Sequence, residues 1–205
     1  MKISCGIVKV LAGLGICFAV NNADALVNGG FEQTVAESDK TGFASVMKNA
    51  GWIFDEPLAF PAGWRVNPGA SKNGEYRSVT GDKVYGGKNS IFLKGHLMYT
   101  TGMDASAGDS VEVSFYSRSE EKNDSGAGVC LYYYCRDEKG RDIFTGSEQF
   151  LVSTETGWSK KTGSIVIPAE SRGKKVSSFI LALFSDKGAY FDDVELKHQK
   201  TGVQR

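Results

Sequence analysis

The sequence predicts an all-β protein, an antiparallel β-sandwich built from nine short strands. From Leu26 onward, apolar residues recur at every second position in short runs. No stretch shows a convincing helical period of about 3.6 residues. Groups of Gly, Asn, Asp and Ser separate the runs, and these residues favour tight turns. Many short strands joined by turns are typical of a sandwich, in which one face of each strand is buried.

The alternation also predicts which side chains of a strand face the core. In Ser110–Arg118, Val111, Val113 and Phe115 share one face, and polar residues occupy the other. Turns are expected between most neighbouring strands, for example at Asp186–Gly188. The expected strands are Gly30–Gln33, Tyr76–Val79, Ser90–Lys94, Met98–Thr101, Ser110–Arg118, Val129–Arg136, Ser164–Ile167, Ser177–Phe184 and Ala189–Lys197.

Two long segments interrupt this pattern. Thr34–Gly63 contains Trp52, Phe54 and Phe60, which is too apolar for a disordered linker, so we expect a packed loop over the sandwich. Glu120–Gly128 is polar and predicts a solvated loop.

The first 25 residues predict a secretory signal peptide. Lys2 and Lys9 accompany a short apolar run that ends in Ala23-Asp24-Ala25, which predicts cleavage after Ala25. The run is too short for a membrane span, so we expect a secreted, periplasmic or cell-surface protein that does not span the membrane. Lipidation at Cys17 is the alternative, but Ile16 argues against it because lipidation signals favour a small residue there. Residues 26–205 then form one domain.

Charge and cysteine content exclude several classes of protein. Without residues 1–25, the 24 basic and 24 acidic residues become 22 and 23, because Lys2, Lys9 and Asp24 are removed. A near-neutral chain without a basic cluster is not expected to bind nucleic acid. Cys130 and Cys135 lie five residues apart on one expected strand, too far for a disulfide between them, and we expect both to be packed as small apolar residues.

The sequence contains no recognisable catalytic set, and we therefore predict a protein that is not an enzyme. The only histidines are His96 and His198, with His198 in a polar tail, so neither a histidine metal site nor a Ser-His-Asp triad is suggested. Carboxylates are numerous, but none form the spaced Glu-x-Asp-x-Glu strand motif of jelly-roll glucanases.

An ordered series of short motifs resembles a known family. The chain from residue 26 begins Leu-Val-Asn-Gly-Gly-Phe-Glu, and its last expected strand contains Tyr-Phe-Asp-Asp-Val-Glu-Leu at 190–196. Between them lie Gly63-Trp64, the Gly-Lys-Asn-Ser segment from Gly87, and Thr156-Gly157-Trp158. Together these pieces resemble carbohydrate-binding modules of families 4, 9 and 22, which share the galactose-binding-domain jelly roll. The resemblance covers nearly all of residues 26–205.

The resemblance implies a structural calcium ion where the first and last strands meet. The matching oxygen donors are Glu32 with Asp192 or Asp193, and the sequence does not decide between the two aspartates. Carboxylates from both ends of the domain would join those ends through the metal. The alternative is an exposed acidic strand end without a metal.

Aromatic residues supply the candidate sugar-binding groups, because a ring can stack on the C–H face of a pyranose. Tyr132 and Tyr134 share the wetter face of their strand, and Tyr116 with Arg118 lies on the polar face of a neighbouring one. We expect these four to line one concave surface. Trp52 either caps this cleft or fills a gap beneath its own loop. Two further tryptophans, Trp64 and Trp158, match family positions that are structural, and we expect them in the core.

These observations predict a non-catalytic, exported protein that holds an oligo- or polysaccharide. The alternative is a structural or adhesive ectodomain that binds a protein partner, since jelly rolls serve both purposes. A groove with open ring faces would favour the sugar, and a broad flat apolar patch would favour the protein.

Overall fold

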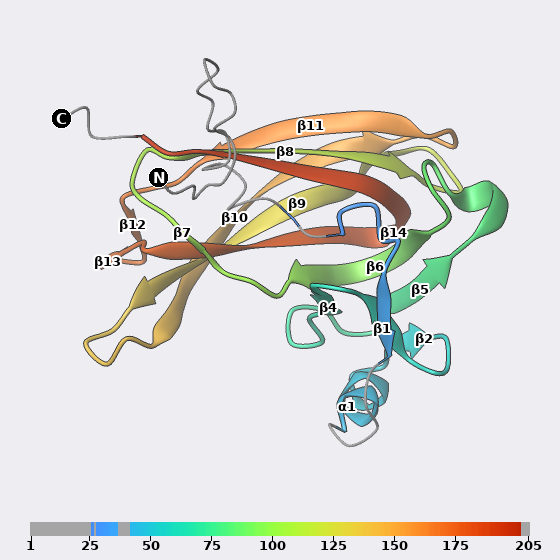
Figure 1. Cartoon of the computed structure of the whole chain (residues 1–205), viewed down its shortest axis with the longest axis horizontal. Coiled ribbons are helices and arrows are strands. Elements are labelled where there is room, and N and C mark those ends of the chain that lie inside the picture. The colour runs from blue at the N-terminus through green and yellow to red at the C-terminus, as the bar shows by residue number, and fades with distance from the viewer. Residues whose placement is uncertain (1–25, 27, 37–41, 202–205) are drawn as a thin grey trace, which may run out of the picture.

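Strands dominate the residues described by the computed structural model, which are 26, 28–36 and 42–201 (Figure 1). The expected signal peptide at 1–25 lies outside the described residues, as does the chain end at 202–205. None of the helices within the described ranges is long and apolar enough to span a membrane. The strands are β1 Thr34–Ala36, β2 Ile53–Phe54, β3 Ala59–Pro61, β4 Trp64–Val66, β5 Glu75–Val79, β6 Ser90–Tyr99, β7 Met103–Asp104, β8 Ser110–Arg118, β9 Asn123–Arg136, β10 Asp142–Thr154, β11 Ser159–Val166, β12 Glu170–Ser171, β13 Lys174–Lys175 and β14 Ser178–Gln199.

The predicted all-β sandwich is confirmed. Hydrogen bonds join ten strands in one continuous sheet, and this sheet folds into two layers. The larger layer contains β10, β9, the first part of β14, β6 and β5. In the smaller layer, β11 pairs with β8, and β8 pairs with the last part of β14 (Figure 1). Every pairing between described strands is antiparallel except that of β2 with β5, which is parallel.

The strand β14 belongs to both layers. Its residues 178–184 pair with β9 on one side, and residues 182–191 pair with β6 on the other. Figure 1 shows β14 bending sharply after this section and returning beside β8, with which residues 190–199 pair. The register against β8 slips between Asp192 and Glu195, and Asp193 has a positive φ of 45° at this bend.

Two expected strands, Ser177–Phe184 and Ala189–Lys197, are thus parts of one strand. The turn expected at Asp186–Gly188 is an irregularity between Ser185 and Ala189, because β6 continues to pair on both sides of it. Ser90–Lys94 and Met98–Thr101 are likewise merged within β6, across Gly95. Extra residues in one strand are accommodated as bulges, which increase the local twist.

The sequence prediction was wrong for three further segments. Gly30–Gln33 contains a turn and irregular backbone, with Phe31 at a positive φ of 57°, and β1 begins only at Thr34. The whole of β10 was missed, and β9 begins at Asn123, inside the expected loop Glu120–Gly128.

The described parts of the segment Thr34–Gly63, residues 34–36 and 42–63, are packed, as predicted, although they contain secondary structure that was not expected. A short helix, α1, spans Phe43–Asn49, and β1, β2 and β3 flank it. Met47 of this helix is fully buried, and Trp52 and Phe60 are 4% and 3% exposed. These side chains therefore extend the core rather than a binding surface.

The core lies between the two layers and follows the predicted alternation. Val111, Val113 and Phe115 of β8 are buried, as are the inward residues Val129 and Leu131 of β9. The Phe115 ring of β8 lies 5.5 Å from the Phe191 ring of the neighbouring strand β14, within the core. The faces assigned to Ser110–Arg118 and Val129–Arg136 are therefore correct, which places Tyr132 and Tyr134 on the outer face of the larger layer.

Candidate functional site

Three rings form an aromatic group on the outer face of the larger layer. Tyr132 and Tyr134 of β9 are half-buried, and Phe144 of β10 is 46% exposed. The Phe144 ring centroid lies 6.0 Å from each of the two tyrosine rings. We call Tyr132, Tyr134 and Phe144 the aromatic face. Phe144 was not predicted, because the strand that carries it was not recognised.

A small apolar cluster lies beside these rings on the same side of the sheet. Cys130 and Phe184 are buried there beside Ala182, although all three point away from the main core. The His96 ring stacks on Phe184 with centroids 5.2 Å apart and lies 6.2 Å from Tyr132. Burial raises the pKa of the Tyr132 and Tyr134 phenols, so both hydroxyls stay protonated and can donate hydrogen bonds at neutral pH.

The predicted binding residues divide between two places. Tyr116 pairs with Asp192 near the bend of β14, whereas Tyr132 pairs with Ile180, and the two tyrosines have different ring neighbours. The guanidinium of Arg118 lies 5.7 Å from the Tyr190 ring, outside the aromatic face. Tyr116, Arg118, Tyr132 and Tyr134 therefore do not line one surface.

Trp52 fills a gap beneath its own loop and does not present a ring face to solvent. Its indole N–H donates to the Ser71 carbonyl at 2.9 Å. The ring lies against Gly74 and Gly95, where an added Cβ would come within 2.5 and 2.6 Å of ring atoms. Of the two alternatives that the sequence left open, the structure supports the packing role.

The other two tryptophans differ from each other. Trp64 is 2% exposed and contacts Phe31 and Tyr99, which confirms its core position. Trp158 is only half-buried, because β11 lies at the edge of the smaller layer, and its ring approaches Tyr85 at 6.0 Å. The expectation of a core position for Trp158 was wrong.

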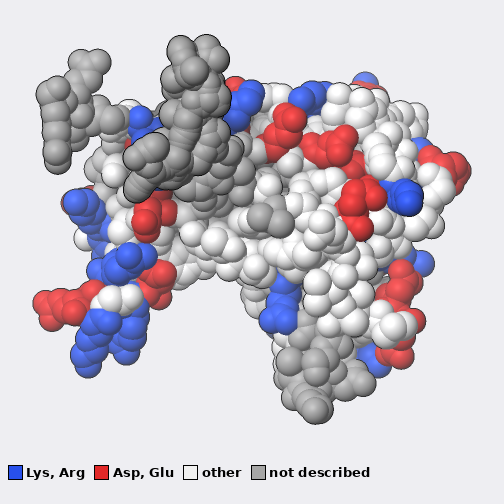
Figure 2. Space-filling view, in the orientation of Figure 1, with Lys and Arg blue, Asp and Glu red and all other residues white. Residues whose placement is uncertain are grey.

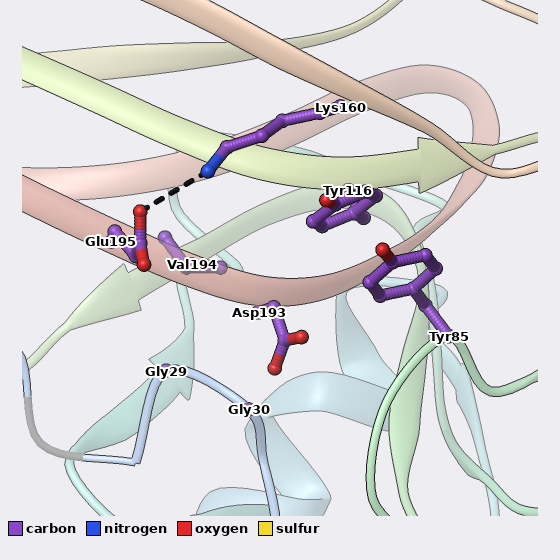
Figure 3. Close-up of a pocket in the computed structure, with 8 residues that line it drawn as sticks. All are labelled: Gly29, Gly30, Tyr85, Tyr116, Lys160, Asp193, Val194 and Glu195. Atoms are coloured by element: carbon purple, nitrogen blue, oxygen red, sulfur yellow. Dashed lines mark hydrogen bonds and ion pairs between the residues drawn. The ribbon is translucent and has the colours of Figure 1, made fainter.

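A hollow of about 500 Å³ lies where β8, β11 and the bend of β14 meet (Figure 3). Tyr85 and Tyr116 stack at its edge, with ring centroids 3.5 Å apart and an interplanar angle of 15°. Lys160 and Glu195 form an ion pair of 3.3 Å at the opposite edge. We call this the tyrosine cavity; its lining residues are Gly29, Gly30, Tyr85, Tyr116, Lys160, Asp193, Val194 and Glu195.

The expected metal-binding carboxylates surround one turn, formed by residues 85–89. Glu32 Oε1 accepts hydrogen bonds from the backbone N–H groups of Lys88 and Asn89, at 2.8 and 3.2 Å. Asp192 is fully buried, and its Oδ2 accepts the N–H groups of Tyr85 and Gly86. Burial raises the pKa of Asp192 to about 6, against the opposing effect of these backbone hydrogen bonds.

The side chains alone do not form a complete calcium site. Within the described residues, no group of three or more His, Cys, Asp or Glu side chains could hold a metal ion. Calcium prefers six to eight oxygen ligands, so carbonyl groups or water would have to supply most of them. The carboxylates of Glu32 and Asp192 hold the turn at 85–89 by accepting hydrogen bonds from its backbone N–H groups.

His198 is not in a solvated tail, as the sequence suggested, but buried at the far end of β14. Its Nε2 lies 3.0 Å from Oδ2 of Asp109, which is 1% exposed. Asp109 also accepts the N–H groups of Ser106 and Thr201, at 2.9 and 2.8 Å. Burial alone would raise the pKa of Asp109, but these hydrogen bonds and His198 hold it below its usual value.

No family model matches this chain, and no curated protein matches it. Among solved structures, it is similar to a xylan-binding CBM22 domain from Paenibacillus barcinonensis, at 18% identity over 68% of this chain and 88% of that one, with a TM-score of 0.42. A cyclase from Fischerella sp. TAU is similar at 13% identity over 87% and 100%, with a TM-score of 0.47. A family 16 carbohydrate-binding module is similar at 19% identity over 58% and 82%, with a TM-score of 0.35. Similarities this distant do not indicate a function. The function is therefore inferred from the residues of the site.

Proposed function

We propose that this protein binds a neutral oligo- or polysaccharide on the aromatic face and does not alter it chemically. The observation that carries this proposal is the group of three partly exposed rings, Tyr132, Tyr134 and Phe144, held at fixed spacing on two paired strands. Rings in this arrangement can stack on the apolar C–H faces of successive sugar units.

Hydrogen-bonding groups lie beside the rings, as a sugar site requires. Ser147 and Gln149 of β10 are exposed, and they pair with Tyr132 and Cys130 of β9. Directly paired residues of antiparallel strands point to the same face, so both side chains border the aromatic face. A neutral sugar would thus meet ring surfaces together with hydroxyl and amide groups, the usual composition of a small-molecule site.

Replacing Phe144 by alanine is expected to weaken polysaccharide binding about tenfold, because the most exposed stacking surface is lost. Tyr132→Ala should have a similar effect. The measurement is affinity electrophoresis or pull-down against a broad panel of neutral polysaccharides. Val166→Ala is the control, because Val166 is 60% exposed and ends β11 in the smaller layer, away from the aromatic face and the tyrosine cavity. Equal losses in all three variants would contradict the assignment of the face.

A protein-binding ectodomain is the second candidate function. The observation that favours it is the exposure of Ile143, Phe144 and Leu151, at 37%, 46% and 48%, on β10. β10 ends the larger layer and so offers an edge to a partner strand. Failure of the protein to bind any polysaccharide of the panel would shift the assignment to this function.

Calcium at the turn 85–89 stays a prediction, and the placement of Glu32 and Asp192 around this turn supports it. A cation there would interact with both carboxylates and would bind the folded state only. We expect added calcium to raise the melting temperature and a chelator to lower it, measured by differential scanning fluorimetry with magnesium as the control. A melting temperature unmoved by both would reject the calcium ion.

A further inference from the structure

We propose that the tyrosine cavity is a second binding site, separate from the aromatic face, and that it takes an amino sugar with a free, positively charged amine. The cavity combines one carboxylate that has no partner among the described residues with two phenols and an ion pair (Figure 3). Its volume of about 500 Å³ is ample for a single sugar unit and lies within the usual range of small-molecule pockets.

The charge of the cavity favours a cation. Lys160 and Glu195 neutralise each other at 3.3 Å, and Ser114 donates a further hydrogen bond to Glu195. Within the described residues, the Asp193 carboxylate forms no hydrogen bond and no ion pair. The remaining charge of the lining is therefore the single negative charge of Asp193. Figure 2 shows acidic and basic side chains interspersed on the visible face of the molecule, so the preference for a cation depends on the local charge of Asp193.

The backbone holds the Asp193 side chain in place at an energetic cost. Its φ of 45° lies in the left-handed region. Residues other than glycine seldom adopt this conformation, which costs about 1 kcal/mol or more. Gly30 and Gly86 leave room for the carboxylate, since a Cβ at either would come within 3.0 and 2.8 Å of its oxygens. Strained residues cluster at functional sites, where the surrounding structure maintains them.

The two tyrosines supply the polar and aromatic groups that a charged sugar requires. Figure 3 shows both hydroxyl groups lying close together beside the cavity. The hydrogen bond to Tyr116, burial and the nearby Asp193 raise the pKa of Tyr85, which keeps its phenol protonated and able to bond sugar hydroxyls. Lys160 already lies 5.8 Å from the Tyr116 ring, so a positive charge is tolerated against this stack.

The test compares three trisaccharides by calorimetry and by NMR titration: one of glucosamine, its N-acetylated form and a neutral glucose trisaccharide. The glucosamine form should bind the full chain roughly five- to tenfold more tightly than the N-acetylated form, because acetylation removes the charge that Asp193 attracts. Asp193→Asn should abolish this preference. Asparagine tolerates positive φ values well, so this variant keeps the backbone and removes only the charge.

Two controls separate this site from the proposed function. Glu112→Gln removes a carboxylate of β8 that pairs with Lys197 at 2.9 Å outside the cavity, and it should leave the preference intact. Phe144→Ala should weaken the neutral sugar without changing the preference for the amine. Equal binding of the amine and N-acetylated forms, or an unchanged preference in Asp193→Asn, would overturn the proposal even if neutral sugars bind the aromatic face.

Discussion

Replacement of Trp52 by alanine is expected to lower the free energy of unfolding by about 3 to 5 kcal/mol, the usual cost of removing a large buried ring. The ring is 4% exposed and fills the space above Gly74 and Gly95. Its N–H also donates to Ser71, so truncation leaves that carbonyl without this donor. Urea unfolding followed by tryptophan fluorescence and circular dichroism measures the loss.

Tyr85→Ala is the matched control for stability, since an aromatic ring that is 44% exposed should contribute far less to stability. The fraction of Trp52→Ala that remains folded should bind sugar like the unaltered protein. A stable Trp52→Ala protein that fails to bind sugar would instead indicate that Trp52 contacts the sugar.

Substitution of Asp109 by alanine is expected to cost about 3 kcal/mol, because it removes a buried carboxylate that accepts several hydrogen bonds. Asp109 accepts hydrogen bonds from Ser106 and Thr201 and contacts His198, which joins the end of β14 to the turn before β8. Alanine would leave these donors without their acceptor. Chemical denaturation at neutral pH measures the loss, and Glu112→Gln, which breaks only an exposed ion pair, should change stability by less than about 1 kcal/mol.

The contribution of Asp109 should also depend on pH. Its pKa is lower in the folded protein than the value of about 3.9 in an unfolded chain. Such a carboxyl stabilises the fold above the unfolded pKa, and this stabilisation disappears as the pH falls through the folded pKa. The stability difference between the unaltered protein and Asp109→Asn should therefore be constant near neutral pH and shrink below about pH 4. A difference that stays constant into strong acid would contradict the role of the carboxylate.

The sequence predicted strands where alternation was regular and failed where it was not. β8 was predicted at its observed bounds because three of its inward residues, Val111, Val113 and Phe115, are apolar and alternate with outward ones. β10 was not predicted because it is an edge strand with mostly exposed residues. In addition, the shift in its pairing register between Phe144 and Gly146 interrupts the alternation of its side chains between the two faces. The helix α1 has only seven residues and no side-chain cap, so it leaves little local signal.

The candidate sites were predictable only in part, for a related reason. Alternation placed Tyr132 and Tyr134 on the correct face of β9, but it could not tell that Tyr116 lies in another layer. That separation depends on the path of β14, which local patterns do not encode. Tyr85 was missed because it is a single aromatic residue in a glycine-rich turn, and only the folded chain brings it onto Tyr116.

The path of β14 also has a consequence for how the chain acquires its fold. Both layers need this strand as the neighbour of β9, β6 and β8, yet it follows all of them in the sequence. A chain that is still being synthesised can form local hairpins, but neither layer is closed until residues 178–199 emerge. Contacts this distant in sequence slow folding, because long loops must close before the contacts form. Until then the facing edges of β9 and β8 are open, and this interval is when the growing chain is most exposed to aggregation.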